Sequence, residues 1–517
     1  MNLADGSFWI YEYDALGQVK SGKRYWSDWT PVAGQSFEYG FDDIGNRNTA
    51  KAGGDENGAD LRSTTYTVNN LNQYSQRTVP GYADINGLVL ATNSVTVNGS
   101  AADYRRGEYF QELLTVVNSS TSVWQTVSVT NTGGGSTTGS VFVAKTPETF
   151  GYDADGNTTN DGRWTLTWDG ENRLVNLTSL NTTPSASRLK LDFAYDGKGR
   201  RIQKIVSAWN GSAYVAQSTN RFVYDGWNLV AELNNVNGLI RSYVWGLDLS
   251  GNEQGAGGVG GLLQVAYYGA QTTNCFAAYD GNGNLTALVN AADGSVFATY
   301  EYDPFGQTIR ATGPMAKADP FRFSTKYQDD ETDWVYYGYR YLRDGRWLSR
   351  DPIEEIDNPN LYSFVGNVPV SSYDIHGLLG CSRDPCADPC GDAERQKIDY
   401  GDVGGIVCCN GTAHVCVWRS GGLSGASSKA AKTIIDKCSR AHENDHRPTV
   451  TCPPGNMLTH GGEPDPVKRK QGECQAYRAQ MACLRSSIGA CDGNPTCITE
   501  VLAEMKEARG KIKENCP

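Results

Sequence analysis

Cysteine is almost absent from the first three-quarters of this 517-residue chain. Cys275 is the only cysteine before residue 380, whereas thirteen of the fourteen lie between Cys381 and Cys516. The shortage excludes a disulfide framework in the first part, and the abundance predicts one, formed outside the reducing cytosol, in the second. A cysteine-rich zinc module is the alternative, but no Cys-x-x-Cys pair recurs at the required spacing. Because thirteen is odd, we expect one thiol to be free or paired with another chain.

Basic residues are also scarce in the first part. Residues 1–380 carry 28 Lys+Arg against 41 Asp+Glu, a net charge of −13, whereas residues 381–517 carry 18 against 17, a net charge of +1. All 14 Phe and 11 of the 12 Trp lie before residue 381. An acidic surface disfavours a nucleic-acid partner, since phosphate binding needs a basic face. The opposite distributions of cysteine and aromatic residues predict two bodies with a boundary near residue 380.

Long apolar runs are missing too. No stretch of 18 apolar residues occurs, so we expect no membrane span. The first residues, MNLADGSFWIYEYD, have neither a basic region nor an apolar region typical of a signal peptide. A disulfide-rich segment without an export signal predicts a secreted or cell-surface protein that uses a dedicated secretion apparatus, or a chain that is the tail of a longer protein.

What the sequence has in quantity is a repeated turn, Tyr-Asp-x-x-Gly. Asp can accept backbone N–H bonds within a β-turn, and Gly supplies the positive φ that the turn needs. The segments after the turns, such as RLVNL and LTALV, alternate in polarity like half-buried strands. The clear copies are YDALG (13–17), YDADG (152–156), YDGKG (195–199), YDGNG (279–283) and YDPFG (302–306).

Irregular spacing between the copies favours a meandering antiparallel sheet over a propeller with blades of fixed length. We expect the aromatic residue before each Asp to face inward and pack on the next hairpin. Sugar binding by these aromatics is the functional alternative to this architectural role.

The segment at residues 302–378 is more specific. It contains YDPFGQ, then PFRFSTKYQDDETDWVYYGYRYLRDGRWLSRDPIEE, then NLYSFVGNVPVSSYDIHGL. This segment resembles the core of RHS/YD-repeat proteins, which include bacterial toxin carriers, insecticidal toxin-complex shells and the teneurin YD shell. The resemblance implies a mainly β fold, a spiralling antiparallel sheet over residues 1–378, divided into repeats (1–300) and core (301–378). It also implies that residues 379–517 form a variable cargo, often a toxin.

The same resemblance implies self-cleavage. In that family the core ends in two Asp-Pro-x-Gly motifs, and an aspartyl cleavage follows the second. These motifs map to Asp351, with Arg350 beside it, and to Asp374, so the cut would follow Leu378. Two close carboxylates can share a proton and act as base and acid. Glu354 stands where the first motif has Gly, and Ile375-His376 replaces Pro-x in the second, which predicts altered turns.

In the cysteine-rich part, the stretch AHENDH (441–446) is an HExxH motif. The preceding residues have helical composition with Ser available as N-cap, which places His442 and His446 on one helix face. That spacing suits two ligands of a tetrahedral zinc, while Glu443 can reach a water as the general base. The sequence therefore predicts a zinc-dependent peptidase.

A third ligand is expected from a second helix that begins at Pro466, with Asp465 as its N-cap. Glu473 on this helix resembles the glutamate that completes the site in gluzincins, although the surrounding family sequence is absent. His460, Glu463 and Asp445 are alternative ligands. Tyr477 is interpreted as a core residue, with transition-state donation as the alternative. Cystines near Cys438, Cys474 and Cys483 are expected to hold the two ligand helices together.

These observations predict an RHS-type toxin or toxin carrier whose β-shell encloses a small, mostly α, disulfide-rich cargo. Its expected partners are a peptide or protein substrate, a cognate immunity protein and a secretion apparatus. Two alternatives stay open: a structural or carbohydrate-binding YD-repeat protein with a non-enzymatic effector, and a cargo resembling a His-Asn-His nuclease. The nuclease motif requires its first His at the end of a β-hairpin, whereas His442 lies in a segment with helical composition.

Overall fold

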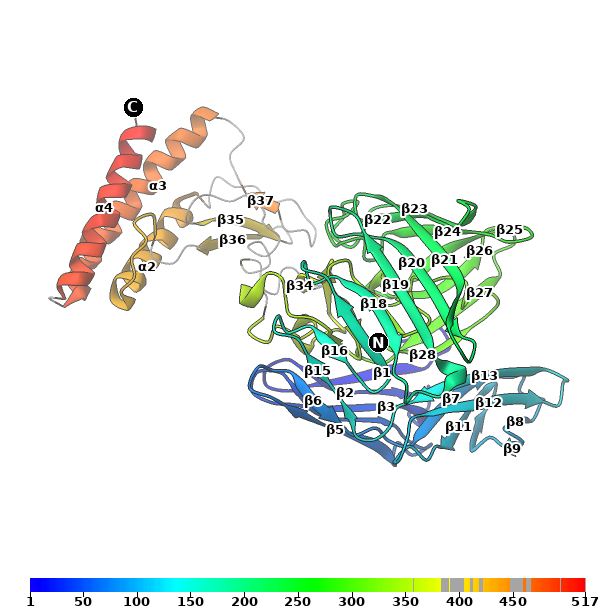
Figure 1. The fold of residues 1–517 in the computed structure, drawn as a ribbon. Coiled ribbons are helices and arrows are strands. Elements are labelled where there is room, and N and C mark those ends of the chain that lie inside the picture. Colours follow the sequence, from blue (N-terminus) through cyan, green and yellow to red (C-terminus); the bar gives the residue numbers. More distant parts are fainter. Residues whose placement is uncertain are drawn as a thin grey trace. The chain divides into compact units, whose positions relative to one another are not determined.

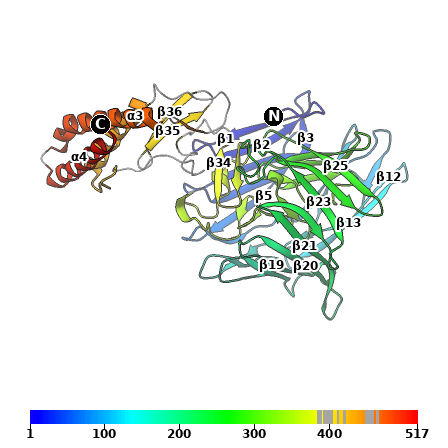
Figure 2. The ribbon, with the colours of Figure 1, turned by 90° about the horizontal axis from the view of Figure 1, so that it is seen from above.

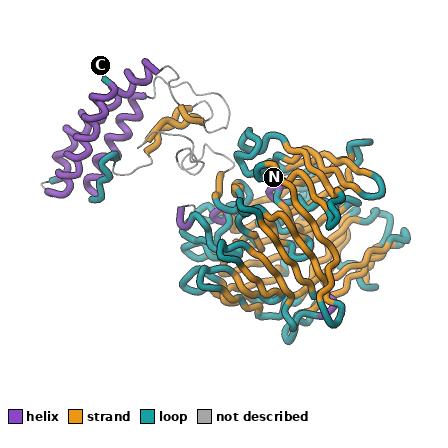
Figure 3. The backbone as a smooth tube through the Cα atoms, turned by 45° about the horizontal axis from the view of Figure 1, so that its top comes forward, coloured by secondary structure: helices purple, strands orange, loops and turns teal. Residues whose placement is uncertain are grey.

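The computed structural model describes residues 1–356, 358–382, 390, 404–409, 412–417, 422–446, 459–461, 466–492 and 494–516. The chain divides into two compact units, Met1–Gly380 and Cys381–Pro517. Strands dominate the first unit and helices the second (Figure 3). This is the fold class that we predicted: a mainly antiparallel β unit followed by a small, mostly helical unit with several disulfides. The division of the first unit at residue 300 stays a prediction.

The first part of unit 1 forms three antiparallel sheets, the largest of which is the seven-stranded sheet drawn mostly in blue in Figure 1. Its strands, in spatial order, are β1 (Phe8–Tyr13), β2 (Val19–Tyr25), β3 (Pro31–Phe41), β4 (Arg47–Gly53), β5 (Leu61–Val68), β6 (Tyr74–Arg77) and β14 (Glu148–Thr149). The two smaller sheets contain β10 (Tyr104–Arg106), β11 (Tyr109–Thr115) and β7 (Tyr82–Leu88), and β13 (Ser136–Val143), β12 (Val123–Asn131), β8 (Val95–Val97) and β9 (Ser100–Ala101).

A fourteen-stranded sheet follows, in which every strand pairs with its neighbours in sequence. This is the meander that the irregular repeat spacing predicts, and Figures 1 and 2 show how strongly the sheet curves. Its strands are β15 (Gly151–Tyr152), β16 (Thr158–Asn160), β17 (Trp164–Trp168), β18 (Leu174–Ser179), β19 (Leu189–Tyr195), β20 (Arg201–Trp209), β21 (Tyr214–Asp225), β22 (Asn228–Leu233), β23 (Leu239–Trp245), β24 (Leu262–Tyr268), β25 (Thr272–Tyr279), β26 (Leu285–Asn290), β27 (Val296–Tyr302) and β28 (Thr308–Thr312).

The repeated turns form as their residues predict. In the turn after β25, the Asp280 carboxylate accepts the backbone N–H groups of Asn282 and Asn284 at 2.8 and 3.0 Å, and Gly283 has a φ of +74°. Asp303 caps its own turn in the same way, with Gly306 at +87°. The Asp side chain thus replaces solvent for the amides that the turn leaves unpaired.

The tyrosines of the repeats anchor neighbouring strands. Tyr302 donates its hydroxyl proton to the backbone carbonyl of Leu285 at 2.6 Å, and Tyr195 donates to that of Leu174 at 2.7 Å. Both are more buried than Tyr13, which is 46% exposed. Tyr13 departs from the inward-facing expectation because β1 is the edge strand of its sheet.

The segment after β28 packs against the face of the fourteen-stranded sheet. Trp334, Tyr336 and Tyr341 share one hydrophobic cluster with Leu177, Val265 and other residues of that sheet. Val370 of this segment packs instead with Trp9 and Phe37 of the seven-stranded sheet and with Phe305 of the turn before β28. The segment contains β29 (Tyr327–Asp329), β30 (Trp334–Tyr336), β31 (Tyr341–Arg343) and β32 (Arg346–Trp347), and then β33 (Ser372–Ile375) paired with β34 (Leu379–Ser382).

In its described residues, unit 2 contains a small sheet and three helices, α2 to α4, that pack side by side. The helices are α2 (Lys429–His446), α3 (Pro466–Ser487) and α4 (Pro495–Asn515), and the sheet consists of β36 (Thr412–Val417), β35 (Gly404–Cys409) and β37 (Thr459–Gly461). α3 begins at Pro466 as predicted, while Asp465, Glu463 and Arg447-Pro448 lie outside the described residues. Short 3-10 turns occur in the chain at Ser185–Ser187, Phe323–Thr325, Glu354–Ile356, Val365–Asn367 and Ile488–Cys491.

Disulfides cross-link these helices. Cys438 of α2 is bonded to Cys483 of α3, and Cys474 of α3 is bonded to Cys516 beyond the end of α4. The first bond joins the two helices that carry the predicted ligands, as we expected. Within the described residues, Cys390–Cys416 and Cys491–Cys497 are also bonded. Among the described helices, none is long and apolar enough to cross a membrane.

Candidate functional site

Helix α2 positions the HExxH residues in unit 2. Its first turn is capped by Ser428, whose hydroxyl accepts the N–H of Ala431 at 3.4 Å, and the helix extends to His446. Ile434, Ile435 and Cys438 are buried against the rest of the unit. His442 and Glu443 follow on the same helix and are 7% and 8% exposed. The apolar residues thus fix the face on which the histidines lie.

The structure brings together the three predicted ligands. Nε2 of His442 lies 3.3 Å from Nε2 of His446 and 3.5 Å from Oε2 of Glu473, and Nε2 of His446 lies 3.6 Å from Oε1 of Glu473. The three ligand atoms lie within 4.8 Å of one another. Donors bound to one tetrahedral zinc at about 2.0–2.1 Å lie about 3.3 Å apart, so the group fits such an ion.

The electrostatics of this group follow from its burial. Burial raises the pKa of Glu443 to about 7, and it lowers that of His446. Burial also opposes ionisation of Glu473, but its hydrogen bond to His442 and the charge of His446 hold its pKa below the ordinary value. Glu473 is therefore ionised, as a metal ligand must be.

The remaining ligand candidates are not at this group in the described part of the chain. Asp445 is exposed, while Glu463 and the side chain of His460 lie outside the described residues. Tyr477 packs against the group instead. Its ring lies 4.3 Å from that of His442, edge to face, one helical turn after Glu473. Tyr477 therefore packs beside the ligands, which fits its interpretation as a core residue.

A second constellation lies in unit 1, around the core aspartates. Asp351 is 8% exposed and Asp374 is fully buried. Asp351 accepts the N–H of Ile353 at 3.0 Å, and Asp374 accepts the N–H groups of Gly377 and Leu378. Asp374 therefore contacts the residue that precedes the predicted cut.

The arginine between the two aspartates is Arg340. Its Nη2 lies 2.7 Å from Oδ2 of Asp351 and 3.9 Å from Oδ2 of Asp374. Arg350, which we had placed beside Asp351, is exposed and packs over Gly156. Arg350 is thus exposed whereas its neighbour Asp351 is buried. The sequence offers no local signal for Arg340.

Both turns around the aspartates form despite the substituted motifs. Glu354, at the position of the first Gly, has a φ of +59°, and His376 has a φ of +62°. The N–H of Glu354 donates to the carbonyl of Asp351 at 3.1 Å. The motif geometry is retained, with backbone strain at a side chain that Gly would not suffer.

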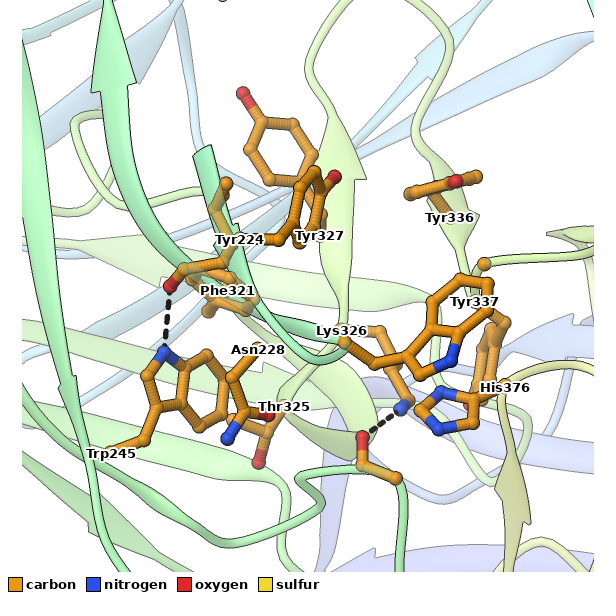
Figure 4. A pocket seen from close by; sticks show the side chains of 14 residues that line it. Tyr224, Asn228, Trp245, Phe321, Thr325, Lys326, Tyr327, Tyr336, Tyr337 and His376 are labelled. Carbon is orange, nitrogen blue, oxygen red and sulfur yellow. Dashed lines mark hydrogen bonds between the residues drawn. The ribbon is translucent and has the colours of Figure 1, made fainter. Parts of the chain in front are cut away.

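A pocket that is partly open to solvent lies beside the second turn, with about 450 Å³ of empty space. Figure 4 shows Lys326 and His376 at one end and Trp245 at the other. His376 stacks on Trp227 with ring centroids 4.7 Å apart, and the Lys326 amine donates to the carbonyl of Gly257. His376 thus acts as a packed turn residue, in agreement with its sequence position.

Burial shifts the titration of this constellation. It raises the pKa of Asp351 to about 6, with the Arg340 charge opposing the shift, and it also raises the pKa of Asp374. It lowers the pKa of Lys326 to about 8 and that of His376 to about 3. Two carboxyls with raised pKa values that share one guanidinium suit acid–base chemistry near neutral pH.

Part of the first unit matches a known protein family. The family model described as RHS Repeat matches residues 279–314, which include the YDGNG and YDPFG turns. Residues 279–314 therefore contain an RHS repeat.

The chain has relatives among toxins. It is 31% identical over 239 residues to the tRNA3(Ser)-specific nuclease WapA of Bacillus spizizenii, covering 44% of this chain and 9% of the relative. It is 28% identical to the toxin protein Tse5 of Pseudomonas aeruginosa, covering 44% of this chain and 19% of the relative. It is 37% identical to the toxin subunit YenC2 of Yersinia entomophaga over 19% of this chain and 11% of the relative. The chain thus spans less than a fifth of these relatives, and no activity of residues 381–517 is defined by them.

A solved structure also matches. The crystal structure of TcdB2-TccC3-Cdc42 has a TM-score of 0.37 and 19% identity, covering 72% of this chain and 18% of that chain.

Proposed function

We propose that this chain belongs to an RHS-type polymorphic toxin, or toxin carrier, in which the β-shell encloses a peptidase cargo formed by residues 381–517. The observation that carries the proposal is the group of His442, His446 and Glu473, whose ligand atoms lie within 4.8 Å of one another. The named toxins among the relatives support the toxin class. We further propose that the protein is secreted or exposed at the cell surface, with a cognate immunity protein and a secretion apparatus as partners.

Zinc is the metal that this group fits, with Glu473 as third ligand and one open position. Bound there, zinc would supply Lewis-acid chemistry, polarising a peptide carbonyl and making water more acidic. Glu443, adjacent in sequence to His442, takes the proton of the attacking water and passes it to the leaving amine. Glu443 is buried beside the ligands, so other water molecules have little access to its carboxylate.

The test compares the full wild-type chain with Glu443→Gln, His446→Ala and Glu473→Gln on a broad peptide library, with zinc content measured. We expect Glu443→Gln to retain zinc and lose hydrolysis by roughly a hundredfold or more. His446→Ala should lose both zinc and hydrolysis. Glu507→Gln, an exposed carboxylate on α4, is the matched control and should change neither. Wild-type protein without zinc, or full hydrolysis by Glu443→Gln, refutes the peptidase and favours a non-enzymatic effector.

A nuclease cargo is the second candidate, because the WapA relatives are named as tRNA nucleases. The net charge of +1 over residues 381–517 gives little attraction for phosphates. Incubating the same four proteins with tRNA separates the candidates. Cleavage of tRNA that is lost in His446→Ala, without peptide hydrolysis by the wild type, supports the nuclease.

We also propose that the chain cuts itself after Leu378 through Asp351 and Asp374. The supporting geometry is the shared contact of the two carboxylates with Arg340 and the bond from the Leu378 N–H to Asp374. Intact-mass analysis should find a fragment that begins at Leu379. Asp351→Asn and Asp374→Asn should leave the full-length chain uncut. If the wild-type chain stays as intact as both variants, the proposal of self-cleavage is wrong.

A further inference from the structure

A second pocket lies in unit 1, between the seven-stranded sheet, the first strands of the fourteen-stranded sheet and the core segment. It has about 420 Å³ of empty space and is partly open to solvent. Its walls come from β4 to β6, from β15 and β16, and from β31 and β32. A space of about 300–1,000 Å³ is typical of small-molecule sites. Neither the proposed zinc group nor the core aspartates line this pocket.

Two arginines in its walls have no carboxylate partner. Arg47 of β4 is 8% exposed and Arg346 of β32 is half-buried, and among the described residues neither forms an ion pair. Arg47 donates to the backbone carbonyl of Asp344 at 3.0 Å. Arg346 donates to the side-chain oxygen of Asn46 at 3.3 Å and to the backbone carbonyl of Asn72. A guanidinium carries five N–H donors, so both side chains keep donors for a ligand.

The other two arginines of the pocket are already neutralised. Arg77 and Arg343 lie against the carboxylate of Glu148, at 2.5 and 2.8 Å, and each also pairs with an aspartate. Their charges therefore leave little attraction for a further anion. Arg47 and Arg346 are thus the cations of this pocket that a bound anion can pair with.

The two guanidiniums lie near one hydroxyl, that of Tyr74. Arg346 lies 4.1 Å from the centroid of the Tyr74 ring. Burial raises the pKa of Tyr74, and the charges of Arg346 and Arg47 both oppose that shift. Burial also raises the pKa of Asp303 to about 6, and the Arg47 charge opposes that shift without an ion pair between the two. Arg47, Tyr74 and Arg346 also border a smaller space of about 210 Å³, so the positive groups lie where the two spaces meet.

Flat rings line much of the larger space. The ring centroids of Tyr66 and Tyr74 are 4.8 Å apart, and that of Phe150 lies 6.4 Å from Tyr74. Tyr152 and Trp347 line the same space. Such walls favour a flat apolar group, whereas a guanidinium matches a carboxylate through two parallel N–H···O bonds.

We propose that this pocket binds a small organic anion that joins a carboxylate to a flat ring, with Arg47 and Arg346 as its anion-binding residues. The carboxylate lies against the two guanidiniums, and the ring lies among the tyrosines. Residues 1–380 carry a net charge of −13, so the field of the unit as a whole repels anions and the attraction is local to this pair. The site belongs to the shell and needs neither the proposed peptidase nor self-cleavage.

The experiment titrates the full chain with benzoate in a calorimeter. Benzamide is the neutral ligand of the same shape, and acetate and phosphate are anions without a ring. We expect saturable binding of benzoate that is roughly tenfold tighter, or more, than that of the other three compounds.

Arg47→Gln and Arg346→Gln should each weaken benzoate binding roughly tenfold or more, because each removes charged donors. Arg62→Gln is the matched control and should leave binding unchanged. Arg62 stacks over Tyr82 at 4.1 Å, as the pocket arginines stack over rings, but it pairs with Asp84 and does not line the pocket.

The proposal is overturned if the wild-type chain shows no saturable binding of benzoate. Benzamide that binds as tightly as benzoate refutes the role of the charge, and phosphate that binds as tightly refutes the role of the ring. Equal weakening in Arg62→Gln and in both pocket variants refutes the assignment to Arg47 and Arg346. The comparison of ligands uses the wild-type chain alone, so it decides the matter even if an arginine variant does not fold.

Discussion

The backbone at Glu354 is left-handed, so this residue strains the turn in which it lies. Its φ of +59° costs an L-residue with a side chain about 1–2 kcal/mol relative to Gly, part of which Gly returns through its looser unfolded state. The side chain itself is exposed, so little packing is lost by its removal. The turn persists because Asp351 and its neighbours hold the backbone on both sides.

Glu354→Gly should therefore raise the free energy of unfolding of unit 1 by about 1 kcal/mol. Denaturant unfolding of the full chain, followed by tryptophan fluorescence, measures the change, since eleven of the twelve Trp lie in this unit. Glu355→Gly is the control, because the neighbouring residue has no positive φ and should lose stability instead. Equal effects of the two substitutions would contradict strain at Glu354.

The titration of Asp351 sets a second expectation at this scale. Its pKa of about 6 lies above the ordinary value, so the carboxyl is mostly protonated at pH 5 and mostly ionised at pH 7. If Asp351 is the base, self-cleavage should be about tenfold slower at pH 5 than at pH 7. Time courses of fragment formation measure this. A rate that falls between pH 5 and pH 7 would assign the ionised role to another group.

Single residues also show what the sequence could reveal. His442, Glu443 and His446 are readable because helical periodicity alone puts the histidines on one face. Arg340 is not, because it lies eleven residues before Asp351 and thirty-four before Asp374, outside both motifs. Adjacency favoured Arg350, but its side chain is exposed while that of Asp351 is buried. Contacts of this kind depend on long-range packing that no local pattern encodes.

Elements in unit 2 depend on cross-links more than on apolar packing. Among the described residues, the apolar cluster between the helices of this unit has nine buried members, which include Cys438, Cys491 and Cys497. α3 carries Glu473 and is joined to α2 by Cys438–Cys483, one helical turn before His442. The disulfide thus holds the third ligand near the two histidines, a role that a small apolar core fulfils poorly.

Replacing both Cys438 and Cys483 by Ser should therefore weaken zinc binding roughly tenfold or more, since loss of a native disulfide costs about 2–4 kcal/mol. Competition with a chromogenic chelator measures the affinity. The matched control removes Cys491–Cys497, which closes a short loop between α3 and α4 and does not link α2 to α3. Equal loss of affinity in both variants would mean that general stability, not the α2–α3 link, governs the site.

Some elements could be predicted from the sequence and others could not. The turns with Asp280 and Asp303 were predictable, since Asp and Gly dictate them locally. α4 and the sheet of β35–β37 were not anticipated. The pairing of β35 with β37 joins residues more than fifty positions apart, so nothing local specifies it. α4 does carry a local signal, with Asn494 as N-cap and Pro495 in its first turn.

At the scale of the molecule, one buried ionic cluster fastens the core segment to the fourteen-stranded sheet. Asp329 of β29 accepts from Arg201 at 2.6 Å and from Lys204 at 2.9 Å, both on β20. The Arg201 guanidinium also lies 4.6 Å from the Tyr336 ring. All three charged groups are less than 10% exposed, so none can turn to solvent if a partner is lost.

Asp329→Asn should lower the free energy of unfolding of unit 1 by about 3–5 kcal/mol, because it removes the counter-charge of the buried Arg201 and leaves Lys204 paired with Glu331 alone. Glu38→Gln is the control, since Glu38 pairs with Lys23 and Lys51 at a partly exposed site and should cost about 1 kcal/mol or less. Thermal and denaturant unfolding of the full chain measure both. Similar costs for the two variants would show that the cluster does not fasten the segment.

The pairing of β33 with β34 has a further consequence for the timing of any toxin action. The predicted cut after Leu378 falls between these strands, so the new amino terminus at Leu379 starts as a strand of the sheet that it has just been severed from. Breaking the peptide bond would leave that pairing intact. Departure of the cargo would then be a dissociation step with its own rate, sensitive to pulling, crowding and dilution. The rate of cargo release from such a toxin would be limited by separation of the two strands rather than by cleavage of the peptide bond.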